Sequence, residues 1–184
     1  MNMFRYKFFI FLLLILLSFS CTNKKTRENA NLYADTLIRL QSEVISQMDT
    51  LIQASYFDDF EIGDFYLKAI NKNKYCITKL NEIKYFSDNR DLYNASHAFY
   101  MTVDGVLKNE GPILLNIKHK MNIAKSQDLR DELDAVLLQS ARKITESQLY
   151  FDSVLTVFLG EYGYDVEMDT NTVSLFRKDS LKNK

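Results

Sequence analysis

The pattern closest to a metal site is a segment near the C-terminus in which oxygen-bearing side chains alternate with other residues. These side chains belong to Asp165, Glu167, Asp169 and Asn171. Calcium takes such ligands, and a calcium loop of the EF-hand type begins in this way. That loop also needs glycine at its sixth position and glutamate at its twelfth, where this chain has Thr170 and Phe176. We therefore interpret the segment as the solvated face of an extended stretch and expect no metal there.

Histidine and cysteine, which carry much metal binding and nucleophilic catalysis, are scarce. His97 and His119 are the two histidines, and no HExxH, Cys-x-x-Cys-His or Glu-x-x-His pattern surrounds either. Cys76 has Lys74 and Lys79 nearby, which would lower the pKa of its thiol. Its apolar surroundings favour a buried small side chain instead. No glycine-rich phosphate loop or Gly-x-Ser-x-Gly elbow occurs in the sequence. We therefore predict no catalytic residue, no metal and no cofactor.

Aromatic side chains are the more informative group, with 11 tyrosines, 13 phenylalanines and no tryptophan. Six of them flank the apolar helix stripes rather than lying on them: Tyr75, Tyr85, Phe86, Tyr93, Tyr100 and Tyr150. Tyrosine joins a large apolar ring to a polar hydroxyl and is enriched at protein interfaces. The six residues are therefore a candidate partner-binding surface, and the alternative is that they cover the margin of the core.

The N-terminal segment has the layout of an export signal. Arg5 and Lys7 form a basic start, and every residue from 8 to 17 is apolar (FFIFLLLILL). Ten residues rise about 15 Å as a helix, which is half of a hydrocarbon core of about 30 Å. The run is too short for an ordinary transmembrane helix. A basic start followed by a short apolar run predicts a cleaved signal peptide over residues 1–20.

The apolar run ends in Leu17-Ser18-Phe19-Ser20-Cys21. These residues resemble the lipobox of bacterial lipoproteins, whose cysteine is acylated and becomes the mature N-terminus. The resemblance implies that Cys21 is lipidated and that the chain is cut after Ser20. Two positions depart from the motif, since Ser18 stands in place of the usual leucine and Phe19 in place of a small residue. Ordinary signal peptidase would cut the same bond, so a soluble secreted protein with a free Cys21 is the alternative.

A lipoprotein of this kind is held at a membrane surface by its acyl chains. The expected location is the bacterial cell envelope, with the outer membrane favoured and its periplasmic or surface face left open. The expected partners are the membrane, through the N-terminal lipid, and another envelope protein. The formal net charge of −1 gives no electrostatic reason to expect nucleic acid. Residues 21–30 continue from the lipidated cysteine into a polar stretch, TNKKTRENA, which predicts a short flexible linker.

The elements that position these residues are predicted to be helices, because the chain has only 5 glycines and 1 proline. Apolar residues recur at helical spacing over about 28–55, 64–85, from 92 to the break at Gly111 and Pro112, and 127–160. The proline either kinks the third helix or starts a short new one. Short connections then predict an all-α fold, an up-down antiparallel four-helix bundle over 31–160. Residues 161–184 are expected to form an extended or β-like, partly disordered tail.

Two functions are consistent with these patterns. The first is a membrane-anchored, non-catalytic binding or structural module, and the mature part as a whole is similar to uncharacterised helical-bundle surface lipoproteins. The alternative is a small-ligand-binding or weakly catalytic bundle, with a pocket lined by tyrosines and His97. An enclosed pocket with convergent polar groups would favour the alternative, and a filled core would oppose it.

Overall fold

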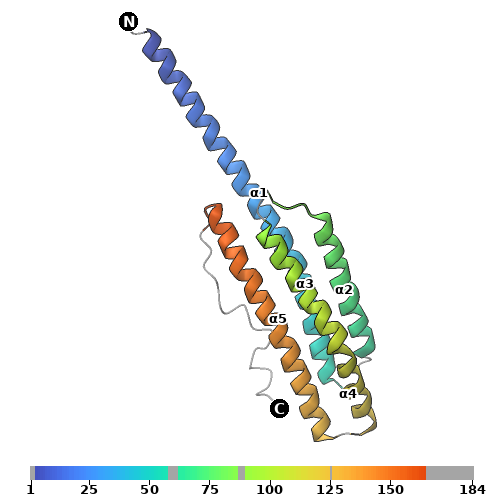
Figure 1. The fold of residues 1–184 in the computed structure, drawn as a ribbon. Coiled ribbons are helices and arrows are strands. Elements are labelled where there is room, and N and C mark those ends of the chain that lie inside the picture. The colour runs from blue at the N-terminus through green and yellow to red at the C-terminus, as the bar shows by residue number, and fades with distance from the viewer. Residues whose placement is uncertain (1–2, 58–61, 87–89, 125, 165–184) are drawn as a thin grey trace.

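The protein is an all-α bundle, as the sequence predicts. The computed structural model describes residues 3–57, 62–86, 90–124 and 126–164, with side chains from Thr26 onward. These residues form five helices (Figure 1): α1 (Met3–Tyr56), α2 (Ile62–Glu82), α3 (Asp91–Asn109), α4 (Gly111–Ile123) and α5 (Gln127–Glu161). None of them, over the residues that the structure describes, is long and apolar enough to cross a membrane.

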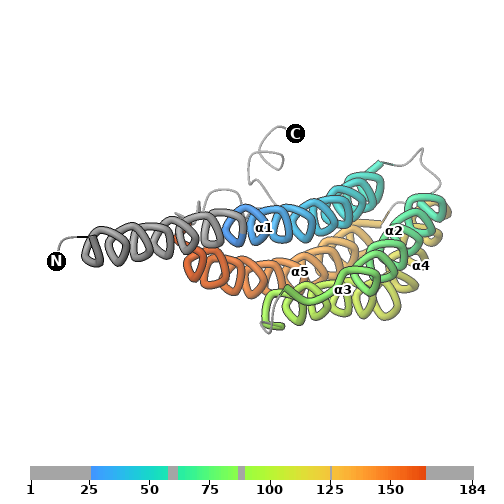
Figure 2. Tube along the Cα trace, turned by 90° about the horizontal axis from the view of Figure 1, so that it is seen from above, coloured from blue at the N-terminus to red at the C-terminus, as the bar shows by residue number. Residues whose placement is uncertain are grey.

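Helices α3 and α4 act as one arm of the bundle, so the five helices make four arms. The backbone N–H of Glu110 donates to Val106 over 2.9 Å, and that of Leu114 donates to Glu110 over 2.9 Å, which continues the helical pattern across the junction. Pro112 has no N–H to donate, and this interrupts the ladder. The four arms run alternately in opposite directions (Figures 1 and 2). The up-down antiparallel topology is therefore confirmed.

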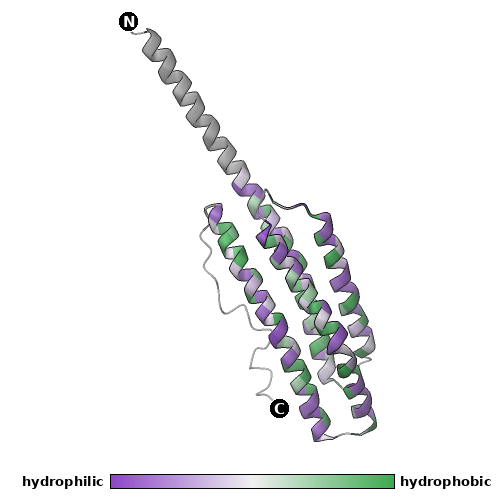
Figure 3. Ribbon diagram, viewed as in Figure 1, coloured by the Kyte–Doolittle hydropathy of each residue, from purple (hydrophilic) through white to green (hydrophobic). Residues whose placement is uncertain are grey.

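Each arm buries one apolar face. On α1 the residues Leu37, Val44 and Leu51, spaced by seven, are at most 3% exposed. This spacing keeps them on one side of the helix. On α5 the same role falls to residues such as Leu133 and Leu137. Figure 3 shows hydrophobic and hydrophilic residues sharing the helices of the bundle. Burial of these faces is the main stabilising contribution to the fold.

The linker expected over residues 22–30 is wrong, because this segment belongs to α1. The part in which side chains are described, Thr26 to Ala30, holds no glycine or proline that would end a helix. Tertiary contacts also hold it. The guanidinium of Arg27 lies 4.3 Å from the centroid of the Tyr164 ring, and the Tyr164 hydroxyl donates to the Arg27 carbonyl over 3.3 Å. Ala30 is fully buried, so the packed bundle begins there.

The C-terminal ends of α2 and α5 lie at positions slightly different from those predicted from the sequence. Helix α2 ends at Glu82 rather than at residue 85, because Phe86 leaves the helical path to pack between α1 and α5. Helix α5 ends at Glu161, and Gly163 follows with a φ of 75°. Glycine adopts this left-handed conformation without a steric penalty, which suits a helix end. The expected extended tail over 165–184 lies outside the described residues.

Candidate functional site

The proposed lipidation and cleavage residues fall in α1. Both Ser20 and Cys21 lie within the backbone span of that helix. Their side chains are outside the part of the structure in which side chains are described, which starts at Thr26. The site residues that can be placed in full are therefore the six aromatic residues, the two histidines and Cys76.

One end of the bundle is closed by a cluster of four aromatic rings, here called the aromatic plug and made of Tyr33, Phe86, Phe158 and Tyr162. The ring of Phe86 lies 5.4 Å from Tyr33, 5.7 Å from Phe158 and 5.4 Å from Tyr162, measured between centroids. The three contacts join α1, the α2–α3 connection and α5. Burial, together with the nearby Tyr93 hydroxyl, raises the pKa of Tyr33 to about 12. Phe86 therefore packs in the protein rather than on a free surface.

Beside the plug lies an aromatic pair made of the exposed Tyr85 and the half-buried Tyr93. The rings of Tyr85 and Tyr93 meet edge to face with centroids 4.7 Å apart, and the guanidinium of Arg90 lies 4.6 Å from the Tyr85 ring. The hydroxyl of Tyr93 donates to the side-chain carbonyl of Asn81 over 3.2 Å. Tyr85 is 44% exposed, so its ring is available to a partner. An aromatic ring stacked on a guanidinium is a common feature of binding surfaces.

Two more of the six residues are exposed, but they lie on other elements. Tyr75 on α2 has the ammonium groups of Lys72 and Lys79 at 5.3 Å and 5.9 Å from its ring centroid. Tyr150 on α5 lines an open groove of about 400 Å³ that also includes Asp91 of α3. Their rings are 49% and 54% exposed. The six aromatic residues therefore do not form one surface, and the exposed ones are divided among three places.

Tyr100 corrects the sequence interpretation, because it is fully buried and is not part of any surface. Its ring packs against Phe99 at 5.4 Å, and the side-chain amide of Asn73 donates to its carbonyl over 3.1 Å. Burial also raises the pKa of its hydroxyl far above the ordinary value. The reason is the central place of α3, which contacts α1, α2, α4 and α5. A helix covered on several sides buries residues that would be marginal on a peripheral helix.

Cys76 lies in the core between α1 and α2, which confirms that it packs as a small apolar residue. It is fully buried, and its sulfur donates to the Leu40 carbonyl over 3.5 Å. Burial, reinforced by the Glu43 carboxylate, raises the pKa of its thiol from 9.0 to about 11. Lys72 and Arg39 act in the opposite direction but have the smaller effect. The thiol is therefore protonated at neutral pH and is a poor nucleophile.

We expect Cys76 to react with Ellman's reagent at pH 8 only when the chain unfolds. The variant Cys21→Ala is used for this test, because Cys76 is then the remaining thiol. A pKa of about 11 instead of 9.0 makes the thiolate about a hundredfold rarer at pH 8. The raised pKa also means that this group stabilises the fold below about pH 9, and that the stabilisation is lost as the pH rises towards 11. Rapid reaction in the absence of urea would contradict the burial.

A small interior cavity lies where α1, α3, α4 and α5 meet. Its volume of about 20 Å³ has room for one water molecule. Glu110 lines it, with one carboxylate oxygen bound by Lys143 and the other buried without a hydrogen-bond partner among the residues that the structure describes. His97 and His119 are not among its lining residues. This cavity is too small for the ligand that the alternative function requires.

Neither metal-ligand geometry nor similarity to known proteins assigns an activity. Over the residues that the structure describes, no three His, Cys, Asp or Glu side chains come together as a metal site. The alternating acidic segment that begins at Asp165 lies beyond those residues. Comparison of the chain with protein-family models, with curated proteins and with solved structures finds no match. A function must therefore be inferred from the residues of the chain itself.

Proposed function

We propose that the chain is a bacterial envelope lipoprotein, anchored to a membrane by acyl chains on Cys21. The observation that carries this proposal is the order of three features: the basic start at Arg5 and Lys7, the apolar run over 8–17, and the lipobox-like segment that ends in Cys21. The helical bundle is then a non-catalytic binding or structural module for another envelope component. The outer membrane is its favoured location.

Two features of the bundle support this division of the chain. The first described core residue is Ala30, so a cut after Ser20 would remove none of the described core. The other cysteine, Cys76, is fully buried and protonated at neutral pH. Acylation of a cysteine in the folded chain therefore falls to Cys21. More than one acyl chain is needed for a stable anchor, and lipoproteins carry several.

The exposed surface is suited to binding rather than to catalysis. Tyr75, Tyr85 and Tyr150 each expose close to half of their area. Each has a charged neighbour on the same surface: lysines at Tyr75, Arg90 at Tyr85, and the carboxylate of Asp91 in the groove beside Tyr150. Large amphipathic rings next to charged groups are the usual anchors of protein interfaces.

Growth of a producing bacterium with radioactive palmitate tests the anchor. We expect the wild-type chain to be labelled and Cys21→Ala to lose the label, because the substitution removes the acceptor sulfur. The matched control is Cys76→Ala, which also removes one cysteine but leaves Cys21 in place. It should keep the full label. Label that persists in Cys21→Ala, or that disappears in Cys76→Ala while the chain is present in equal amount, would refute the proposal.

A further inference from the structure

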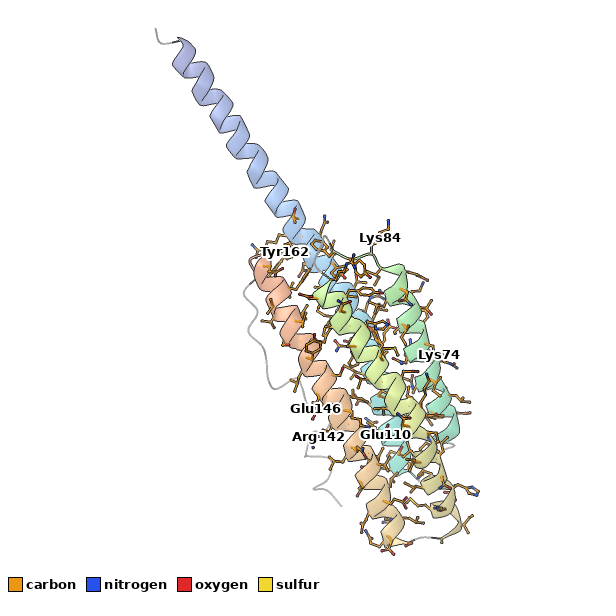
Figure 4. The ribbon with its side chains drawn as sticks, viewed as in Figure 1. Lys74, Lys84, Glu110, Arg142, Glu146 and Tyr162 are labelled. Carbon is orange, nitrogen blue, oxygen red and sulfur yellow. The ribbon has the colours of Figure 1, made fainter. Side chains whose placement is uncertain are left out.

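The end of the bundle at which α1 emerges also holds the α2–α3 connection and the end of α5. The contacts of Tyr33 with Phe86 and of Arg27 with Tyr164 join these three segments. Figure 4 shows Lys84 and Tyr162 at this same end. Any anchor attached at Cys21 therefore holds this end of the bundle nearest to the membrane.

Cationic and aromatic side chains occur together at this end and form what we call the collar: Arg27, Lys84, Tyr85, Arg90 and Tyr164. Arg27, Lys84 and Arg90 are exposed, as is Tyr85. Both arginines lie over aromatic rings, at 4.3 Å for Arg27 and 4.6 Å for Arg90. This combination resembles the composition of protein surfaces at membrane headgroups, where tyrosine rings and long cationic side chains are enriched.

The net charge of this end of the bundle includes the charges of the segment between Cys21 and Ala30. Glu28, Asp91 and Glu161 are exposed at the same end and balance the three cations of the collar. Lys24 and Lys25 precede them in the sequence and add two positive charges next to Cys21. Asp88 in the sequence of the α2–α3 connection removes one of these charges, so residues 24–28, 84–91 and 161 hold five basic and four acidic side chains and have a net charge of +1. This small positive surplus favours a surface of anionic lipids.

The length of the connection between the anchor and the bundle limits their separation. Nine residues lead from Cys21 to Ala30, and α1 spans both positions. At 1.5 Å per residue, this helical segment is about 14 Å long. A helix transmits its orientation, unlike a flexible linker, so the collar stays within about this distance of the lipidated residue. A tilted α1 would place the collar at the level of the lipid headgroups.

We propose that the collar docks on an anionic membrane surface, with the Tyr85 ring at headgroup level and Arg27, Lys84 and Arg90 beside lipid phosphates. This inference rests on the proposed function, since the anchor at Cys21 brings the collar to the membrane. It adds that the bundle has a fixed orientation, with its α2–α3 connection towards the lipid and its α4 end pointing away.

The absence of tryptophan from the sequence allows a direct test. Tyr85→Trp introduces a single tryptophan into the collar, and Tyr75→Trp introduces one at a similarly exposed tyrosine in the middle of α2. The full chain, purified from a lipidating host, is reconstituted into vesicles of phosphatidylcholine with or without phosphatidylglycerol. We expect the emission of Trp at position 85 to shift to shorter wavelength, and its quenching by acrylamide to fall severalfold, most strongly with phosphatidylglycerol. Emission from position 75 should not change.

A second variant tests whether the response at position 85 depends on contact between the cations of the collar and the lipid headgroups. In Tyr85→Trp combined with Lys84→Gln and Arg90→Gln, the preference for phosphatidylglycerol should be lost, because two cations of the collar are removed. A vesicle-bound chain in which positions 85 and 75 respond alike would overturn the collar inference and leave the anchor intact. The mass of the purified chain reports the fatty acid separately. A chain without fatty acid would refute the proposed function, whereas a response at position 85 alone would still support the collar.

Discussion

Phe158→Ala is expected to lower the free energy of unfolding by about 3–5 kcal/mol, the cost of removing a large aromatic side chain from a packed core. Phe158 is 2% exposed and is one of the four rings of the aromatic plug. Its centroid lies 5.8 Å from Tyr33, 5.7 Å from Phe86 and 5.1 Å from Tyr162. The ring therefore joins α1, α5 and the α2–α3 connection, and its loss leaves a cavity that all three segments line.

The neighbouring residue provides the control. Val157 is 64% exposed, so Val157→Ala should change the free energy of unfolding by less than about 0.5 kcal/mol. Urea denaturation of both variants, monitored by circular dichroism, measures the two free energies of unfolding. The slope of the free energy against urea concentration should be the same for both variants. Equal effects of the two substitutions would show that the plug does not hold this end of the bundle together.

Two glycines in the α3–α4 arm are expected to respond to alanine with opposite signs. A Cβ added to Gly111 would lie 2.3 Å from a ring carbon of Tyr66, and the Tyr66 hydroxyl donates to the Leu107 carbonyl over 2.8 Å. Gly111→Ala must displace this ring and strain its hydrogen bond. We expect it to lower the free energy of unfolding by about 1–3 kcal/mol, as overpacking does elsewhere.

Gly105 is the matched position, because it lies inside α3 and nothing is within 4 Å of an added Cβ. Gly105→Ala should raise the free energy of unfolding by about 0.5–1 kcal/mol, since alanine loses less conformational freedom in a helix than glycine. Thermal and urea unfolding of both variants test the pair. An increase in the free energy of unfolding for Gly111→Ala would mean that the Tyr66 ring does not pack closely on the α3–α4 junction at Gly111.

The arms of the bundle could be predicted from sequence because their signals are local. The spacing of Leu37, Val44 and Leu51 along α1 needs no information from other segments. The interruption at Pro112 follows from the missing N–H of proline. The end of α5 near Gly163 follows from the conformational freedom of glycine. Each of these features depends on neighbouring residues, and each is found in the structure.

The features that sequence did not predict depend on packing between distant segments. Tyr100 looks marginal on its own helix but is buried because four other helices contact α3. Phe86 follows the predicted end of the second helix at residue 85, and in the structure it joins the aromatic plug. The segment before Ala30 is polar enough for a linker, yet Tyr164 packs on Arg27 from the other end of the described chain. Such contacts carry no periodic signal in the sequence.

Two of these differences, the helical segment before Ala30 and the packing of Phe86, bear on how the bundle is connected to the proposed anchor. A flexible linker would allow any face of the bundle to meet the membrane. A helical connection, held by Tyr164 and closed by the plug, favours one orientation instead. Under the proposed anchor, Tyr75 in the middle of α2 lies away from this end and is open to a protein partner, whereas the groove beside Tyr150 also includes Asp91 and Glu161 of this end.

Membrane anchoring by this chain depends on the covalent state of Cys21, and the intact mass of the chain purified from the producing bacterium measures that state most directly. The two export routes cut the same bond after Ser20, so they differ in what the new N-terminal residue carries. The lipoprotein account predicts a chain of residues 21–184 whose mass is increased by acyl groups on Cys21, recovered from the membrane fraction. A chain that begins at Cys21 with no added mass would contradict it.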